Sequence, residues 1–189
     1  MKNLFLSIFI LFSCSSFANE DLYKNKLSKY FKNIDEFSSA FIQIQNNDIS
    51  EGFLYIKNKR LRIDYVSPRN LIFVLKKNKG MFYNPNLEEV QYFNTKNSSG
   101  EIFFDLFHND KFILNASITK EKAGFYVKKT ILIDDMSYAI TILFEASPLE
   151  LRKIELNNNN EKTSFAIINP NYNPELNSKM FSLANPLLK

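Results

Sequence analysis

The chain of 189 residues has little of the chemistry that most metal and nucleotide sites need. One His and one Cys cannot assemble a His/Cys metal cage. Four Gly, scattered along the chain, cannot form the glycine-rich loop that binds phosphate groups. Trp is absent, but 19 Phe and 9 Tyr are present, and 45% of the residues are hydrophobic. The sequence therefore predicts one globular domain, or two small ones, with a substantial core, and neither a metal nor a cofactor.

The chain carries a net charge of +4, with an isoelectric point of about 9.0. Basic proteins bind nucleic acid or anionic membranes when their positive side chains form a patch. Here the positive residues alternate with acids, as in Lys120-Glu121-Lys122. Lys greatly outnumbers Arg, and Asn, Ile and Phe are abundant, which is typical of proteins from an AT-rich genome. We therefore expect no nucleic-acid partner.

Residues 1–18 have the three parts of a secretory signal peptide. Met1-Lys2-Asn3 is a short positive region, residues 4–12 are apolar except for Ser7, and Ser16-Phe17-Ala18 puts small residues at the −3 and −1 positions of a cleavage site. The apolar run is too short to span a membrane, and no later segment reaches the ~18 apolar residues that spanning requires. The sequence predicts a signal peptide at 1–18 and one exported domain at 19–189.

Cys14 offers a second interpretation of this N-terminus. Leu11-Phe12-Ser13-Cys14 resembles a bacterial lipobox, in which Cys14 would become a lipidated N-terminus. Phe12 fits poorly at a position that usually holds a small or β-branched residue, and the Ala18 site competes. We favour cleavage after Ala18, which would leave no cysteine and therefore no disulfide in the mature protein.

Two amphipathic helices are expected. The first spans 19–38, with lysines on its polar face and an apolar face at roughly helical spacing that holds Leu22, Leu27, Tyr30, Phe31 and Ile34. The second spans 100–107, where a wide apolar stripe is formed by Ile102, Phe103, Leu106 and Phe107. Each helix must cover an apolar surface.

Short strands separated by turns fill most of the remaining chain. Their expected ranges are 40–45, 52–57, 61–66, 71–76, 80–83, 90–93, 112–119, 125–133, 138–145, 149–156 and 162–168. Residues 169–189 contain Pro170, Pro174 and Pro186 and are expected to be mostly irregular, with one short turn of helix. The expected fold class is α+β: a strongly bent antiparallel sheet or barrel of about eleven strands that curls around the two short helices.

Candidate catalytic groups are few. His108 follows the Phe-rich helix, but no nucleophile-elbow motif accompanies it, and a surface His at a helix C-terminus is the more ordinary interpretation. The pairs Asp134-Asp135 and Glu88-Glu89 lie at expected turns or strand starts, where carboxylates are usually solvated. We therefore expect a protein that is not an enzyme.

The aromatic surplus has two interpretations. Residues 71–75 are apolar on both faces, and Phe103, Phe104 and Phe107 fall within five residues. Such residues form either a thick core or a cavity for an apolar ligand with the helices as its lid. Composition does not distinguish the two.

Short motifs in a fixed order extend over most of residues 20–186. They are Phe41-Ile42-Gln43, Gly52-x-Leu54-x-Ile56-Lys57, Leu61-Arg62-Ile63-Asp64-Tyr65-x-x-Pro68, Met81-Phe82-Tyr83-Asn84-Pro85 with Glu88-x-Val90, Leu151-x-Lys153-Ile154-Glu155-Leu156, Thr163-x-Phe165, and Asn173-x-x-Leu176 with Phe181 and Pro186. Each is loose, but their order and spacing together resemble the LolA family, the periplasmic carriers of outer-membrane lipoproteins.

The resemblance implies an open, incomplete antiparallel β-barrel that holds the acyl chains of a lipoprotein between its concave face and a lid of short helices. The cavity would be lined by Leu54, Ile56, Leu61, Ile63, Tyr65, Phe103, Leu106 and Phe107. The first helix would contribute Leu27, Tyr30, Phe31 and Ile34 to the lid. The implied partners are acylated lipoproteins, an ATP-driven inner-membrane complex that releases them, and an outer-membrane acceptor; the carrier itself is expected to be a monomer.

The chain departs from the family at one turn. The family has a Lys-Arg-Pro turn whose arginine closes the lid by hydrogen bonding to it. This chain has Lys57-Asn58-Lys59-Arg60, one residue shorter and without the proline. Lys57 and Arg60 are the candidates for the lid latch, although a Lys lacks the planar multi-donor fork of an Arg.

Three other functions stay open. The first is the lipid-anchored outer-membrane acceptor of the same fold (LolB-like), which lipidation of Cys14 would favour. The second is a periplasmic lipid-binding or sensor module, although this length leaves no room for the second domain that such sensors usually carry. The third is an exported hydrolase that depends on His108.

Overall fold

A computed structural model describes residues 15–96, 98–122, 124–133, 135–158 and 161–188. The helices are α1 (Ser15–Lys32), α2 (Ser99–His108), α3 (Asp110–Leu114) and the 3-10 turn η1 (Ser178–Phe181). The strands are β1 (Glu36–Gln45), β2 (Asp48–Lys57), β3 (Arg60–Ser67), β4 (Leu71–Lys76), β5 (Lys79–Asn84), β6 (Glu89–Phe93), β7 (Ser117–Glu121), β8 (Gly124–Ile133), β9 (Met136–Ala146), β10 (Leu149–Asn157) and β11 (Lys162–Asn171). Residues 1–14, which include the apolar part of the expected signal peptide and Cys14, lie outside the described residues.

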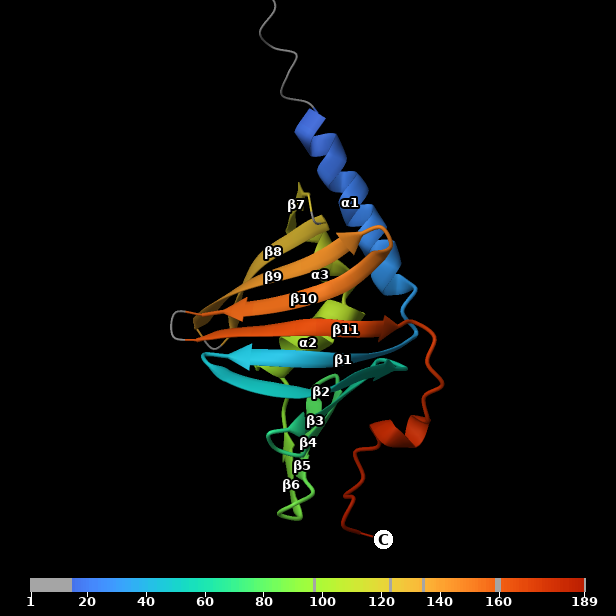
Figure 1. Cartoon of the computed structure of the whole chain (residues 1–189), viewed down its shortest axis with the longest axis vertical. Helices are drawn as coiled ribbons and strands as arrows, with labels where there is room; N and C mark the ends of the chain where they lie inside the picture. The colour runs from blue at the N-terminus through green and yellow to red at the C-terminus, as the bar shows by residue number, and fades with distance from the viewer. Residues whose placement is uncertain (1–14, 97, 123, 134, 159–160, 189) are drawn as a thin grey trace, which may run out of the picture.

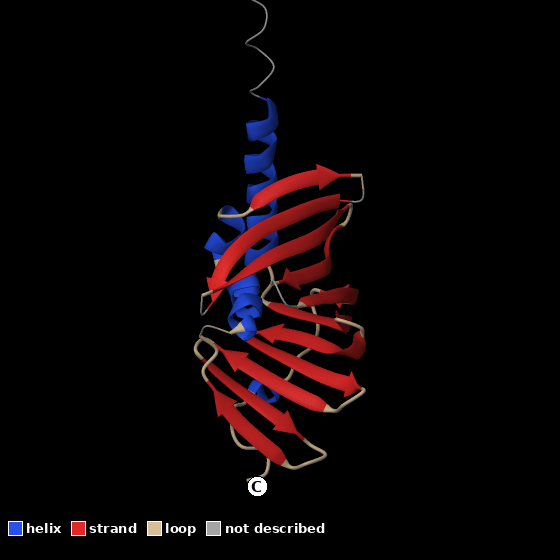
Figure 2. Ribbon diagram, turned by 90° about the vertical axis from the view of Figure 1, so that its left-hand side faces the viewer, coloured by secondary structure: helices blue, strands red, loops and turns tan. Residues whose placement is uncertain are grey.

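The strands form one antiparallel sheet of eleven strands in the order β6-β5-β4-β3-β2-β1-β11-β10-β9-β8-β7 (Figure 1). All neighbours follow each other along the chain except β1 and β11, which pair across the middle of the sheet. The outermost strands, β6 and β7, do not pair with each other in the described sheet. The sheet curls, and helices α1, α2 and α3 lie on one side of it (Figure 2). The expected open α+β barrel is therefore confirmed.

The turn between β2 and β3 shows how the sequence sets one hairpin. Asn58 and Lys59 both have positive φ angles, 51° and 55°. A two-residue loop with both central residues in the left-handed region is the type I′ turn, whose twist matches that of the flanking strands. The turn fixes the register Lys57↔Arg60, Ile56↔Leu61 and Leu54↔Ile63. The apolar residues of both strands therefore share one face.

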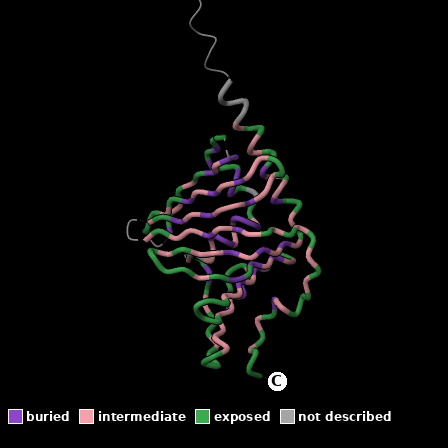
Figure 3. The backbone as a smooth tube through the Cα atoms, viewed as in Figure 1, coloured by how far each residue is buried: buried purple, intermediate pink, exposed green. Residues whose placement is uncertain are grey.

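The main core lies between the concave face of the sheet and the helices, as the distribution of buried segments shows (Figure 3). Phe37 and Phe41 of β1 alternate with more exposed residues, as a strand with one buried face requires. From α1 and α2, Phe31 and Phe107 meet edge to face with ring centroids 5.9 Å apart. Each such side chain contributes roughly 1.5–3 kcal/mol when fully buried, so this layer holds the helices on the sheet.

Gly52 makes room for this layer at the centre of the sheet. A Cβ there would lie 2.2 Å from the carbonyl oxygen of Asp64 and 2.8 Å from the ring of Phe41. The Phe41 ring therefore lies over the glycine backbone, where it packs edge to face against Tyr65 at 5.2 Å. The glycine of the G-x-L motif is required by this close approach.

The convex face carries a second, smaller buried set. The register places Val74 and Met81 opposite each other on this face, and both are buried although they lie outside the main core. Phe181 of η1, which lies against β3, is also buried. The C-terminal segment after β11 runs down this side of the sheet, as the red trace shows (Figure 1). Lys57 and Arg62 donate hydrogen bonds to the carbonyls of Leu176 and Met180, so the segment lies along β2 and β3 on this face.

Three sequence expectations were wrong in detail. The first helix ends at Lys32 rather than residue 38, and Phe37 already belongs to β1. Residues 112–119 were expected as one strand but form the end of α3 and the start of β7. Asn109 caps α3 by accepting a hydrogen bond from the Lys111 amide at 3.1 Å, and Phe112 and Ile113 are buried. Leu22, expected on the apolar face of the first helix, is 62% exposed.

Candidate functional site

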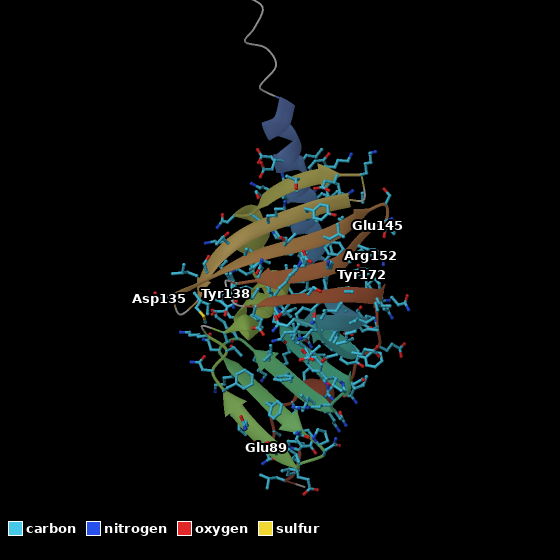
Figure 4. The ribbon with its side chains drawn as sticks, turned by 60° about the vertical axis from the view of Figure 1, so that its left-hand side comes forward. Glu89, Asp135, Tyr138, Glu145, Arg152 and Tyr172 are labelled. Atoms are coloured by element: carbon cyan, nitrogen blue, oxygen red, sulfur yellow. The ribbon has the colours of Figure 1, made fainter. Side chains whose placement is uncertain are left out.

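A cavity of about 360 Å³ lies on the concave face, between the sheet and α2. Its lining comes from seven strands, the segment that begins α2 and the turn between β10 and β11. The lining residues are Gln43, Gln45, Ile63, Tyr65, Phe73, Leu75, Phe93, Ser98, Gly100, Phe103, Tyr138, Leu156, Asn158, Glu161, Thr163 and Phe165. Tyr138 lies at the edge of the molecule where β9 begins (Figure 4). The opposite ends of β9, β10 and β11 carry Glu145, Arg152 and Tyr172 (Figure 4). The cavity therefore belongs to the edge where β1 and β10 end.

The walls of the cavity are mostly aromatic. Phe103 of α2 meets Phe165 of β11 edge to face, with ring centroids 4.7 Å apart. Tyr65 packs against Phe73 at 5.9 Å, and Phe73 against Phe82 at 5.2 Å. The Phe103–Phe165 contact joins α2 to β11 at the cavity.

One side of the cavity is polar. Gln43, Gln45, Glu161 and Thr163 line it at the ends of β1 and β11, and the Tyr65 hydroxyl donates a hydrogen bond to Gln43 Oε1 at 2.5 Å. Burial raises the pKa of Tyr65 to about 12, so its hydroxyl is protonated at neutral pH. The cavity thus combines apolar walls with a few convergent polar groups, as ligand sites commonly do.

The structure divides the predicted cavity residues into two groups. Ile63, Tyr65 and Phe103 line the cavity. The others are buried in the core beneath the helices and do not line it: Leu54, Ile56, Leu61, Leu106 and Phe107. The sequence could not separate core from cavity, and in the structure the aromatic surplus supplies both.

Several lining residues were missed, among them Phe73, Phe93 and Phe165. Phe165 belongs to the Thr163-x-Phe165 motif and pairs with Gln43 in the register, so that motif carried the signal. Phe73 stands in a run that is apolar on both faces, where alternation gives no indication of direction. Gln43 and Gln45 lie on the same face of β1 as Phe37 and Phe41. The alternation of the strand could therefore have predicted that they face the concave side.

The predicted lid residues of the first helix face the core. Leu27 and Phe31 are buried, and Tyr30 and Ile34 are partly buried against the same cluster. Tyr30 and Phe31 each meet Phe144 of β9 edge to face, at 5.5 and 5.6 Å. The Tyr30 hydroxyl also lies 2.7 Å from the Tyr172 hydroxyl, and burial raises the pKa of Tyr30. These contacts fix the C-terminal half of α1 to β9 and to the residue that follows β11.

The two latch candidates contact the C-terminal segment. Lys57 Nζ donates to the Leu176 carbonyl at 2.5 Å and pairs with Glu36 at 2.8 Å. Arg60 Nη1 lies 3.4 Å from the Phe181 carbonyl oxygen, which it reaches as a donor. Both side chains follow the convex-face phase of their strands, opposite to Ile56 and Leu61. Their role as a lid latch stays a prediction, which these contacts do not support.

The candidate catalytic groups lie apart from the cavity lining. His108 Nδ1 lies 2.9 Å from the Phe104 carbonyl oxygen, and its ring stacks on Phe104 at 4.5 Å. Glu89 accepts a hydrogen bond from Gln91, Asp135 is exposed, and Asp134 lies outside the described residues. Within the part of the chain that the structure describes, no cluster of three His, Cys, Asp or Glu side chains is arranged to hold a metal ion. Among the described helices, none is long and apolar enough to cross a membrane.

Comparison with known proteins places the fold. No curated protein sequence matches the chain. An uncharacterized conserved protein from Thermus thermophilus is similar in structure with a TM-score of 0.54 at 6% identity, over 85% of this chain and 91% of that protein. A domain from Vibrio parahaemolyticus, named for outer membrane lipoprotein sorting, has a TM-score of 0.50 at 10% identity, over 82% of this chain and 94% of the domain. MucB has a TM-score of 0.52 at 11% identity, and the match covers 87% of this chain but 62% of MucB.

These similarities establish a shared fold and no more, because the identities are low. The sequence itself provides the closer assignment. The model of the family described as outer membrane lipoprotein carrier protein LolA matches residues 32–184, which include all eleven strands and helices α2 and α3. The chain therefore belongs to the LolA family.

Proposed function

We propose that this protein is a periplasmic carrier that shields the acyl chains of lipoproteins and moves them from the inner to the outer membrane. The observation that carries the proposal is the aromatic cavity between α2 and the concave sheet, in a chain of a family named for lipoprotein carriage. Its partners would be acylated lipoproteins, the inner-membrane complex that releases them with ATP, and the outer-membrane acceptor.

The energetics explain why such cargo needs a carrier. Burying a methylene group gains about 0.8 kcal/mol, so one long acyl chain gains roughly 10 kcal/mol when it leaves water. Unassisted escape from a membrane is correspondingly slow. A carrier must replace the membrane environment and still release the chains, which favours adaptable aromatic walls over a tight pocket.

The mechanism that we propose follows from the small volume of the cavity. About 360 Å³ is at the lower end of the roughly 300–1,000 Å³ that ligand pockets occupy. Cargo with three acyl chains therefore requires α2 to move away from β11, which separates Phe103 from Phe165. Return of the helix would favour release to an acceptor with higher affinity.

Two measurements test the proposal together. Mass spectrometry of lipids extracted from the purified protein should find acyl chains, and the protein should release lipoproteins from spheroplasts into solution. Cavity-blocking Gly100→Leu, on the face of α2 that lines the cavity, should reduce both. A protein that carries no acyl chains and releases no lipoprotein is not a carrier.

The lipid-anchored acceptor remains the second candidate, because the lipobox-like segment would anchor the protein at Cys14. Intact-mass analysis of the protein from membranes distinguishes the two. A mature chain that begins at Asn19 supports the soluble carrier, whereas a diacylglyceryl group on Cys14 supports the acceptor.

A further inference from the structure

Four polar side chains form a continuous hydrogen-bonded row along one side of the cavity. The Tyr65 hydroxyl donates to Gln43 Oε1 at 2.5 Å, and Gln43 Nε2 donates to Gln45 Oε1 at 3.0 Å. Gln45 Nε2 in turn donates to Glu161 Oε1. We call Tyr65, Gln43, Gln45 and Glu161 the polar row. All four residues line the cavity and are half-buried.

The two Gln of the polar row occupy positions of β1 where the alternation of the strand would place apolar residues. Phe37 and Phe41 precede Gln43 and Gln45 in the same phase, so all four side chains point to the concave side. Tyr65 reaches Gln43 from β3 across β2, at the level of Gly52. Burying amide groups in an apolar wall costs free energy unless they are hydrogen-bonded. A cavity for hydrocarbon alone would be better lined by Leu or Phe at these positions.

The donors and acceptors of the row are not balanced. Each hydrogen bond runs in the same direction, so the amide oxygens of both Gln accept a bond within the row. Each Gln amide has two N–H groups, and the bonds among the described residues use one of them. The second N–H of each Gln is therefore available to an acceptor on a ligand. The row ends in the carboxylate of Glu161, which accepts hydrogen bonds and repels anions.

This arrangement fits one kind of head group. Ester and amide carbonyls are uncharged acceptors, and in an acylated lipid they lie directly beside the hydrocarbon. The apolar walls at Phe73, Phe103 and Phe165 would hold the chain while the two Gln amides donate to the carbonyls. A free fatty acid would place its carboxylate near Glu161, where two like charges in a partly desolvated site are unfavourable.

We propose that the polar row is a subsite for the neutral ester and amide groups that join acyl chains to their head group, and that Glu161 makes the cavity reject free fatty acids. The inference rests on the proposed lipid-carrying function and adds its head-group selectivity. The row thus lets the carrier distinguish esterified or amide-linked cargo from the fatty acids that are also present in membranes.

Three single-chain probes of equal chain length test the subsite: 1-monomyristin, myristate and tetradecane. Their affinities are measured by competition with a fluorescent lipid, at neutral pH. The protein should bind 1-monomyristin about tenfold more tightly than myristate, an amount that corresponds to one or two hydrogen bonds. Equal affinities, or a preference for myristate, overturn the inference.

Variants of the row assign the effect to its residues. The double variant Gln43→Leu/Gln45→Leu should weaken the binding of 1-monomyristin about fivefold to tenfold and leave the affinity for tetradecane unchanged. Glu161→Gln should strengthen the binding of myristate and leave the affinity for 1-monomyristin nearly unchanged. Gln91→Leu is the matched control, because Gln91 also bonds a neighbouring glutamate but lies on β6 outside the cavity lining. It should alter none of the three affinities.

Folding of the variants is checked by circular dichroism. If the double Leu variant does not fold, Tyr65→Phe replaces it, because this change removes only the hydroxyl that orients Gln43. It should weaken 1-monomyristin about threefold without an effect on tetradecane. If the protein binds tetradecane and no variant changes its affinity for 1-monomyristin, the subsite is refuted and the carrier proposal stands. Failure of all three probes to bind the unmodified protein refutes both.

Discussion

At the scale of single residues, His108 combines burial with an unsatisfied atom. Its Nε2 is buried and has no hydrogen-bond partner among the described residues, while Nδ1 bonds the Phe104 carbonyl. Desolvation lowers the pKa of His108 below 6.5, and the charge of Lys59 adds to this, whereas the bond to Phe104 and the charge of Asp105 act in the opposite direction. The ring is therefore neutral in the folded protein at neutral pH, and its charging opposes the packing of α2.

This environment predicts a pH dependence of stability. Because the folded pKa lies below the unfolded value, the unfolded chain binds the proton more readily as the pH falls past 6.5. The contribution of His108 to the free energy of unfolding should be constant above that pH and should decrease as the pH falls from 6.5 towards the folded pKa. Urea titrations between about pH 8 and pH 5 measure it.

His108→Gln should remove this part of the pH dependence. His108 is the only His in the chain, so no other imidazole titrates in the interval. An Asp105→Asn variant, which removes the nearby carboxylate, should keep the decrease and make it steeper, because that charge raises the pKa of His108. Identical pH profiles for the unmodified protein and His108→Gln would show that the imidazole is not responsible.

At the scale of elements, the segment after β11 acts as part of the fold. Arg62 Nη1 donates to the Met180 carbonyl at 2.7 Å and Lys57 to the Leu176 carbonyl, so strands β2 and β3 hold the segment by its backbone. Phe181 supplies the apolar contact. A segment fixed at several positions contributes to stability although most of it is irregular.

Replacing Phe181 by Ala should therefore destabilise the protein strongly. Its side chain is 1% exposed, and truncations of buried Phe cost about 3–5 kcal/mol. Leu188→Ala serves as the control, because Leu188 lies in the same segment and is 78% exposed. It should change the free energy of unfolding by less than about 0.5 kcal/mol in urea denaturation. Similar effects of the two changes would mean that the segment is not packed on the sheet.

Regular alternation made most strands predictable, and its loss explains the errors. Tyr138, Ile140, Ile142 and Phe144 alternate through β9, and the expected strand there was confirmed. Between Ile34 and Phe37 the apolar spacing fits a helix and a strand equally, so the helix was extended too far. In 112–119 the cap at Asn109 and the packing of α3 on α1 override the preference of β-branched residues for strands.

At the scale of the whole molecule, the cavity and the attachment of α1 lie at opposite ends of the strands. The cavity is near Tyr138, whereas the Tyr30–Tyr172 contact lies at the end where Arg152 pairs with Glu145 and Glu150 (Figure 4). Filling the cavity therefore need not disturb the attachment of α1. The sequence could not predict this separation, because position along a curved sheet depends on register and bulges, such as the one between Leu151 and Lys153.

A single introduced tryptophan should report cavity filling, because the natural chain has none. The emission wavelength of Phe103→Trp should change when 1-monomyristin enters the cavity and contacts the ring, because the ring then has new neighbours. Tyr92→Trp is the control, on the convex face at a position that is 57% exposed, and its emission should not change. An equal response at both positions would indicate binding to the surface.

The outer strands β6 and β7 do not pair with each other in the described sheet, and this affects how the sheet could enlarge. In a closed barrel, strand number and shear fix the circumference and hence the enclosed volume. Here the sheet can uncurl while all its ladders between neighbouring strands remain intact. Uncurling of the sheet would therefore expose apolar surface and raise the heat capacity of the protein. The strand amides would keep their protection against hydrogen exchange. Unlike a closed barrel, a sheet whose outer strands β6 and β7 do not pair with each other has no enclosed volume fixed by its strand number and shear.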